Sequence, residues 1–441
     1  MIGLIQALMQ EQGYDLDESI DSGTALVADL GFSSLDFVQL IVAFEEVWGR
    51  KFGFQELLLK GGTYVKDVTV AEFSNFVSQQ LIGGDVDGAQ VDSAEADSLA
   101  PPSALAATEC IPAVTPDMVA AFRRTIRPRQ LRSADPSSPM NPRAVFVLSP
   151  PRSGSTLLRV ILAGHPKLFA PPELYLLMYD DLRQRRLELA GEVNSHLLEG
   201  TIRALDEVLG CGPDEAEALM AGFEGQAMPT RDFYGYLQSR LSDRLLVDKT
   251  PLYPLDPAIL ARAEVDFDEP LFIHLVRHPY GMIRSYEESQ LDRFVPVLYE
   301  NAFHRRQLAE LTWYLCHQNI IEFQDRIPQS RWLRISYESL VTSPEREISS
   351  ICGFLGLELV PAMLEPYSSP ERRMLSGTKQ LTRMPGDLKF HLHKSIAPEA
   401  ASRWQQYLRT DFLGDPTWQL ATSLGYERCQ VRDLLAAVAV P

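Results

Sequence analysis

The sequence predicts two folded parts, a small α-helical bundle followed by an α/β domain built on a P-loop-like parallel sheet. The α/β prediction rests on residues 144–148, an apolar run typical of a buried parallel strand. A turn of Pro, Gly and Ser separates this run from an apolar helix start at 156–162. A strand, a small-residue loop and a helix N-terminus together form a cradle for a phosphate group.

Composition limits the function classes. The chain of 441 residues predicts about two to three domains, and no apolar run approaches the roughly 18 residues of a membrane span. The net charge of −18 argues against a nucleic-acid binder. Five scattered cysteines have no metal-ligand spacing, and the first residues lack the basic lead of a signal peptide. We therefore expect a cytoplasmic protein with reduced thiols, no metal site and no membrane span.

Residues 1–81 form the predicted helical bundle. Helical periodicity indicates helices at Ile2–Gln10, Leu35–Trp48 and Val70–Leu81. Residues 1–80 contain 12 acidic and 4 basic side chains, so this part is strongly acidic. Such a surface favours encounters with basic partner surfaces.

The string from Asp29 to Leu40 carries a motif, Asp-Leu-Gly-x-x-Ser-Leu, that ends at Ser34-Leu35. It resembles the phosphopantetheine site of acyl and peptidyl carrier proteins, although Ser33 stands where the family usually has Asp. The resemblance implies 4′-phosphopantetheine on Ser34, added by a phosphopantetheinyl transferase. The alternative is that Ser33 or Ser34 is an ordinary helix N-cap.

Residues 82–140 have the Ala, Pro, Ser, Gly and Asp content of a linker. Within this linker we expect a short helix at 115–124, with Thr115 as its N-cap and Pro116 as its first residue.

The loop after the first strand differs from that of nucleotide triphosphatases. Ser149 holds the position of their first glycine, Ser155 that of their lysine, and the cation comes earlier, at Arg152. The loop resembles the 5′-phosphosulfate loop of sulfotransferases, which use 3′-phosphoadenosine 5′-phosphosulfate (PAPS). The resemblance assigns PAPS contacts to Arg152, Ser153, Gly154, Ser155 and Thr156.

Further segments between 141 and 428 resemble tyrosylprotein sulfotransferases and the sulfotransferase modules of polyketide synthases. Arg277, at the end of an apolar strand at 271–277, and Ser285 match the family's 3′-phosphate site, with His278 where the family usually has Asp. Tyr337 matches a residue near the adenine, and Lys389 lies in a segment that resembles the closing loop. Each residue alone would be an ordinary surface or core residue.

The catalytic groups follow from the same resemblance. Lys249 matches the family lysine near the bridging oxygen, although Asp-Lys-Thr could also be a plain strand-end turn. Arg152 would answer negative charge, and Glu173 would be the general base. The rival base is a histidine, His391 or His393, whereas His165 is expected to be a structural residue at a helix end.

The predicted sulfotransferase domain covers 141–435, with a helical lid insertion at 179–245. The two resemblances imply a fusion that sulfonates a hydroxyl on a carrier-bound acyl or peptidyl chain in secondary-metabolite or lipid biosynthesis. Its expected partners are assembly-line or acyl-loading enzymes. Because the chain has no Gly-x-Ser-x-Gly motif, any thioesterase would be a separate protein. Two alternatives stay open: an enzyme for a diffusible alcohol or phenol that uses the carrier for docking, and a non-catalytic carrier or scaffold.

Overall fold

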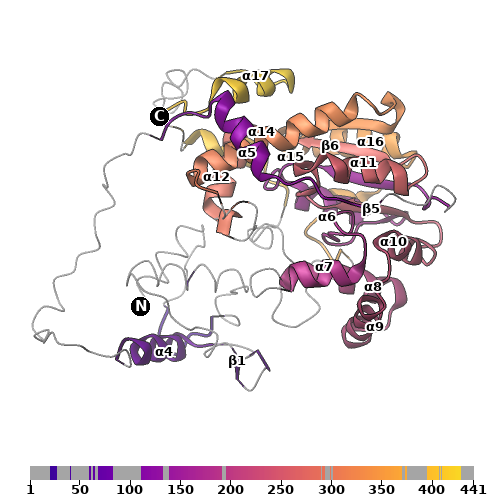
Figure 1. Cartoon of the computed structure of the whole chain (residues 1–441), viewed down its shortest axis with the longest axis horizontal. Helices are drawn as coiled ribbons and strands as arrows, with labels where there is room; N and C mark the ends of the chain where they lie inside the picture. Colours follow the sequence, from indigo (N-terminus) through magenta and orange to yellow (C-terminus); the bar gives the residue numbers. More distant parts are fainter. Residues whose placement is uncertain are drawn as a thin grey trace, which may run out of the picture. The chain divides into compact units, whose positions relative to one another are not determined.

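The computed structural model divides the chain into two compact units, Met1–Pro112 and Ala113–Pro441 (Figure 1). The residues that it describes are 20–26, 40, 59–60, 63–64, 68–82, 111–132, 139–190, 195–289, 291–293, 298, 301–369, 373–374, 395–406, 408 and 410–428.

The first unit contains the helix α4 (Val70–Ile82), which confirms the third helix predicted there. Its N-terminus is fixed by a reciprocal pair, since Glu72 N–H donates to Thr69 Oγ1 and Thr69 N–H donates to Glu72 Oε2. Before it, β1 (Leu59–Lys60) and β2 (Thr63–Tyr64) pair antiparallel, which the helical prediction did not include. Ser34 and most of the predicted bundle lie outside the described residues.

The second unit is built on a five-stranded parallel sheet, as predicted. Its order is β4-β5-β3-β6-β7, with β3 at the centre. All five residues of β3 are buried because helices cover both faces of the sheet. The strands are β3 (Ala144–Leu148), β4 (Leu168–Phe169), β5 (Leu245–Lys249), β6 (Leu271–Val276) and β7 (Trp332–Ser336).

Two apolar cores lie on the two faces of this sheet. Successive residues of β3 alternate between them, with Phe146 in one core and Val145 and Val147 in the other. The helices outside the insertion are α6 (Ser155–Ala163), α11 (Pro257–Asp266), α12 (Pro279–Ser289), α14 (Arg305–Gln324), α15 (Tyr337–Thr342), α16 (Pro344–Leu355) and α17 (Asp415–Ser423). Short 3₁₀ turns are η2 (Tyr253–Leu255), η3 (Leu291–Arg293), η4 (Gln329–Arg331), η5 (Pro361–Leu364), η7 (Pro398–Ala401) and η8 (Arg403–Gln406).

The helix α5 (Pro116–Thr125) confirms the prediction within the linker, and Thr115 Oγ1 accepts the N–H of Met118. Phe122 and Val114 are buried in a third apolar core with residues of α12, α14 and α17. Residues from Ala113 onward therefore belong to the second unit, because their apolar side chains pack into its core. The boundary between the two compact units thus lies at Pro112/Ala113, whereas the predicted sulfotransferase domain begins at 141.

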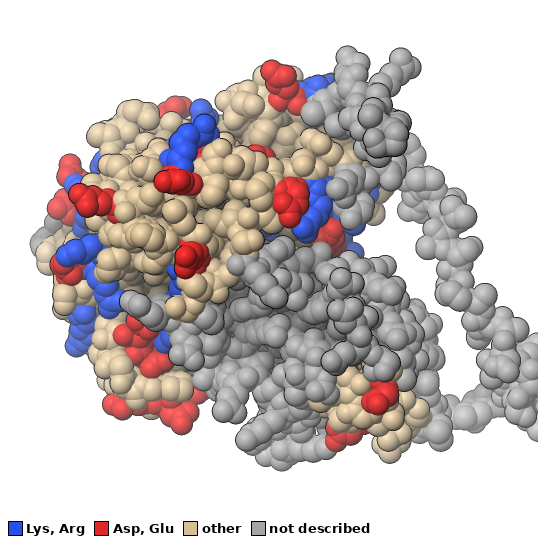
Figure 2. All heavy atoms as spheres, turned by 180° about the vertical axis from the view of Figure 1, so that it is seen from behind, with Lys and Arg blue, Asp and Glu red and all other residues tan. Residues whose placement is uncertain are grey.

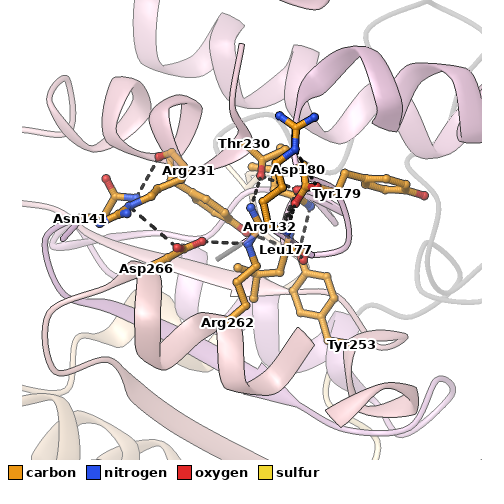
Figure 3. A network of polar contacts seen from close by, with 12 residues as sticks. Arg132, Asn141, Leu177, Tyr179, Asp180, Thr230, Arg231, Tyr253, Arg262 and Asp266 are labelled. Atoms are coloured by element: carbon orange, nitrogen blue, oxygen red, sulfur yellow. Dashed lines mark hydrogen bonds and ion pairs between the residues drawn. The ribbon is translucent and has the colours of Figure 1, made fainter. Parts of the chain in front are cut away.

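The predicted insertion at 179–245 is helix-rich, as expected. Its elements are α7 (Leu182–Leu189), η1 (Ser195–Leu198), α8 (Glu199–Leu209), α9 (Pro213–Gly225) and α10 (Thr230–Gln238). A polar network ties it to the sheet domain (Figure 3). Within this network, Arg262 of α11 donates to the carbonyls of Leu177 and Tyr179 and pairs with Asp266.

On the face of the second unit visible in Figure 2, basic and acidic side chains are interspersed around a broad uncharged area. In the part of the chain that the structure describes, no helix is long and apolar enough to cross a bilayer.

Candidate active site

The carboxyl ends of the strands meet at one edge of the sheet because all five strands are parallel. Register places Lys249 of β5 beside Val147 of β3, and His274 of β6 beside Leu148. Ligand sites of open parallel sheets lie at this edge. At this edge, each of the five strands ends in, or is followed by, one predicted residue or loop. These are Glu173 after β4, Lys249 in β5, the loop 149–154 after β3, Arg277 after β6 and Tyr337 after β7.

The loop between β3 and α6 has the backbone of an anion cradle. Arg152 and Gly154 have φ angles of 63° and 86°, and Gly154 is the N-cap of α6. The first N–H groups of a helix have no intrahelical acceptor; here those residues include the predicted Ser155 and Thr156. Ser149 and Ser153 are fully buried, and their hydroxyls have no hydrogen-bond partner among the described residues. These groups fit a phosphate or sulfate ligand.

Tyr337 packs directly on this loop. A Cβ atom on Gly154 would lie 2.2 Å from Tyr337 Cδ2, so the ring approaches to a distance that only glycine allows. The guanidinium carbon of Arg277 lies 4.3 Å from the centre of the same ring. The adenine and 3′-phosphate residues predicted from sequence are therefore neighbours.

Hydrogen bonds join Arg277 and Ser285 to the loop. Arg277 Nη1 donates to the carbonyl of Arg152 over 2.7 Å, and Arg152 Nε donates to Ser285 Oγ over 3.1 Å. All three residues are half-buried. The structure thus brings the predicted donor residues into one group and links Arg152, predicted for the 5′ side, to the 3′-side serine.

Lys249 and Glu173 form a buried ion pair. Lys249 Nζ lies 2.5 Å from Glu173 Oε1, and their side chains are 2% and 9% exposed. Tyr175 Oη donates to the other carboxylate oxygen over 2.6 Å. Burial lowers the pKa of Lys249, and the charge of Glu173 opposes that change. The pKa of Tyr175 is raised by burial and by Glu173, so its hydroxyl stays a donor.

The groups of this pair are chemically able to perform two of the functions that group transfer to a hydroxyl requires. A carboxylate can take the acceptor proton, and a buried ammonium can stabilise negative charge on a departing oxygen. Burial strengthens charge interactions of this kind because the effective dielectric constant is lower than in water.

The histidines divide into described and undescribed positions. His391, His393 and Lys389 lie outside the described residues. His165 is structural, as expected: its Nδ1 accepts from Lys167 N–H, and its Nε2 lies 3.1 Å from the carbonyl of Glu358.

His278, in the position of the usual acid, caps α12. Its Nδ1 accepts the N–H of Tyr280, and its ring stacks on Trp404 at 4.2 Å. Burial, and then the charge of Arg277, lower its pKa to about 3. A neutral imidazole therefore does the capping that an Asp would do.

Sequence reasoning missed Tyr175, Ser149 as a buried donor, and the surroundings of Asp248. Tyr175 follows Glu173 by only two residues, so the two side chains are close in the sequence. That spacing was the available signal.

Comparisons with known proteins identify the family. Residues 142–361 match the model of a sulfotransferase family. The chain is 36% identical to the sulfotransferase domain of the Synechococcus PCC 7002 olefin synthase, with a TM-score of 0.60, over 68% of this chain and all of that domain. The chain belongs to the sulfotransferase family.

Two further relatives support this assignment. The sulfotransferase domain from the curacin biosynthetic pathway is 35% identical, with a TM-score of 0.61, over 66% of this sulfotransferase and 99% of that domain. The nodulation protein NoeE of Sinorhizobium fredii is 26% identical over 310 residues, which are 65% of this chain and 67% of that protein. Among the described residues of the sulfotransferase, no cluster of His, Cys, Asp and Glu could hold a metal ion.

Proposed function

We propose that this sulfotransferase uses PAPS to sulfonate a hydroxyl on an acyl or peptidyl chain carried by phosphopantetheine on Ser34. The observation that carries the chemistry is the buried Lys249–Glu173 pair at the same sheet edge as the anion loop. The proposed setting is secondary-metabolite or lipid biosynthesis.

The donor would be held by two groups of residues. The N–H groups at the start of α6, Arg152 and the Ser149 and Ser153 hydroxyls would bind the phosphosulfate. Arg277 and Ser285 would bind the 3′-phosphate, and Tyr337 would face the adenine. PAPS supplies an activated sulfuryl group; positioning and charge stabilisation are the work of the protein.

In the proposed step, Glu173 accepts the proton of the acceptor hydroxyl as its oxygen bonds to sulfur. The bond between sulfur and the phosphate oxygen breaks, and Lys249 donates a hydrogen bond to that oxygen. The proton ends on Glu173, and the electron pair leaves with adenosine 3′,5′-bisphosphate. Tyr175 holds the second oxygen of the carboxylate.

The carrier half of the proposal rests on the Asp29–Leu40 motif and the acidity of residues 1–80. Two relatives belong, by their names, to an olefin synthase and to the curacin biosynthetic pathway. Both names suit an acceptor that is built on an assembly line.

An intact-mass assay tests the whole proposal. The chain is coexpressed with a broad-specificity phosphopantetheinyl transferase, loaded with a 3-hydroxyacyl group and incubated with PAPS. We expect one arm on the wild type, none on Ser34→Ala, and a sulfonate gain on the loaded protein. Sulfonation of free alcohols or phenols alone would favour a diffusible acceptor, and transfer to no acceptor would favour a scaffold.

The donor is tested separately by thermal shift. Adenosine 3′,5′-bisphosphate should raise the melting temperature more than AMP does at the same concentration, because AMP cannot use Arg277 and Ser285. Equal shifts, or a preference for ATP with magnesium, would contradict the assignment of the loop.

A further inference from the structure

The segment that follows Glu173 is held by side chains from other elements. Its backbone groups lie outside the sheet, yet buried groups of this kind need partners. Five side chains supply hydrogen bonds to residues 174–179: Arg185 to the Leu174 carbonyl, Thr250 to Tyr175 N–H, Tyr253 to Leu176 and Leu177 N–H, Arg262 to the Leu177 and Tyr179 carbonyls, and Thr230 to the Tyr179 carbonyl.

Asp248 organises two of these side chains. Thr250 Oγ1 donates to Asp248 Oδ1 over 3.0 Å, and Tyr253 Oη donates to Asp248 Oδ2 over 3.0 Å. A hydroxyl has one proton, so each oxygen that donates to the carboxylate presents only lone pairs to the backbone N–H groups. An ionised carboxylate, which only accepts, enforces this orientation on both hydroxyls. Tyr234 Oη adds a third donor.

The end of β5 also carries Lys249, which forms the ion pair with Glu173. Asp248 and Lys249 are consecutive in β5, so their side chains leave opposite faces of the sheet. Lys249 bonds the carboxylate of Glu173, while Asp248, through Tyr253 and Thr250, fixes the backbone just after Glu173. Tyr175 within this segment has a φ of 50°, a conformation that non-glycine residues adopt only when surrounding contacts impose it.

We propose that Asp248 is a positioning residue for the Lys249–Glu173 pair: it orients the hydroxyls that fix the Glu173 segment and places a negative charge beside Lys249. This inference rests on the proposed function, in which Glu173 and Lys249 act on the acceptor and the leaving oxygen. It assigns to Asp248 no contact with either substrate.

The charges around Lys249 define a pH signature. Glu173 and Asp248 raise the pKa of Lys249, whereas burial and the charge of Arg159 lower it. Burial raises the pKa of Asp248, and its three hydroxyl donors and Lys249 lower it. Loss of the Asp248 charge should therefore let Lys249 deprotonate at lower pH.

Two variants separate orientation from charge. Asp248→Asn keeps the shape but removes the charge, and its amide donor forces one of the two hydroxyls to turn. Tyr253→Phe keeps the charge but leaves Leu176 and Leu177 N–H without their acceptor. Tyr236→Phe is the control, because Tyr236 lies on the same helix as Tyr234 and packs against Phe223 and Arg240 instead.

Hydrogen exchange tests the orientation of the Tyr253 and Thr250 hydroxyls and needs no substrate to accept a sulfuryl group. In Tyr253→Phe the amides of Leu176 and Leu177 should exchange roughly tenfold faster, the size expected for one lost buried hydrogen bond. In Asp248→Asn the same increase should appear at Tyr175, or at Leu176 and Leu177, according to which hydroxyl turns. Tyr236→Phe should leave them unchanged. Unchanged exchange in both Asp248→Asn and Tyr253→Phe would overturn the proposal, whatever the acceptor proves to be.

Turnover of the hydroxyacyl-loaded protein tests the consequence. Both variants should lower kcat roughly tenfold or more, while affinity for adenosine 3′,5′-bisphosphate stays within about twofold of wild type. The alkaline limb of the kcat–pH profile should move to lower pH in Asp248→Asn and stay in place in Tyr253→Phe. A wild type without turnover would refute the proposed function and leave the exchange result to decide on Asp248. Faster exchange with unchanged kcat would show that Asp248 serves folding alone.

Discussion

The two sides of the active site are built differently. On the donor side, Arg152, Arg277 and Tyr337 are half-buried. Arg277 donates to the Arg152 carbonyl and lies against the Tyr337 ring, and Arg152 donates to Ser285. On the acceptor side, Lys249 and Glu173 form a buried pair, and the segment after Glu173 is held by hydrogen bonds from several elements. In the proposed function, the donor side would receive an anion, whereas the acceptor side would keep two reacting groups at a fixed distance.

The comparison is tested most strongly by Glu173→Gln. The amide keeps the shape but cannot take a proton, so kcat should fall about a hundredfold or more while donor affinity stays near wild type. Steady-state kinetics and a thermal shift with adenosine 3′,5′-bisphosphate measure the two effects. His391→Ala and His393→Ala should be mild; an inactive histidine variant beside an active Glu173→Gln would move the base to the closing segment.

The donor side is tested by Arg277→Ala. Loss of a charged hydrogen bond should weaken binding of adenosine 3′,5′-bisphosphate roughly ten- to hundredfold, with a much smaller effect on AMP. Arg284→Ala, on the helix α12 that follows Arg277, is the control, because Arg284 pairs with Glu288. Equal losses for both nucleotides would mean that Arg277 acts only by holding the loop through the Arg152 carbonyl.

The sequence predicted the donor side more completely than the acceptor side for a physical reason. The strand at 144–148, the loop and Arg277 depend on local signals: apolar runs, small residues and an Arg at a strand end. The contacts of Asp248 with Tyr234 and Tyr253 join separate segments, and only the folded chain shows them. Composition likewise does not show that Phe122, within the predicted linker, packs into the third core.

Two glycines allow a matched comparison of the two sides. A Cβ on Gly200 would lie 2.0 Å from the carbonyl oxygen of Glu173, and one on Gly154 would meet the Tyr337 ring. Gly200→Ala should therefore lower kcat, and Gly154→Ala should weaken donor binding, each by roughly tenfold. Such a change corresponds to about 1–2 kcal/mol of free energy, the cost expected when a new Cβ atom displaces the local backbone.

The control for these variants is Gly210→Ala. Gly210 has a φ of 62°, and nothing lies within 4 Å of its Cβ position. An alanine there would therefore have the same kind of backbone strain as Gly154→Ala, but no steric contact. It should lower the melting temperature slightly and change neither kinetic constant. A donor-binding loss in Gly210→Ala as large as that in Gly154→Ala would assign the effect to stability.

The smallest expected effect is on the free energy of unfolding at low pH. Burial holds the pKa of His278 at about 3 in the folded chain, against an ordinary value of 6.5. Below pH 6.5 the unfolded chain binds a proton that the folded chain does not, so stability falls as the pH drops from 6.5 toward 3, by roughly 1 kcal/mol over the first pH unit. His278→Asn keeps a capping side chain without this titration and should make the loss of stability smaller by about that amount.

His304→Asn, at the exposed N-cap of α14, is the control. Burial also lowers the pKa values of His274 and His317, and both residues are present in both variants. Urea unfolding at pH 6.5 and 5.5 should therefore show a smaller loss of unfolding free energy in His278→Asn alone, and part of the loss should remain. Equal slopes in the two variants would show that His278 takes up a proton while folded, and that the donor side does not depend on a neutral imidazole.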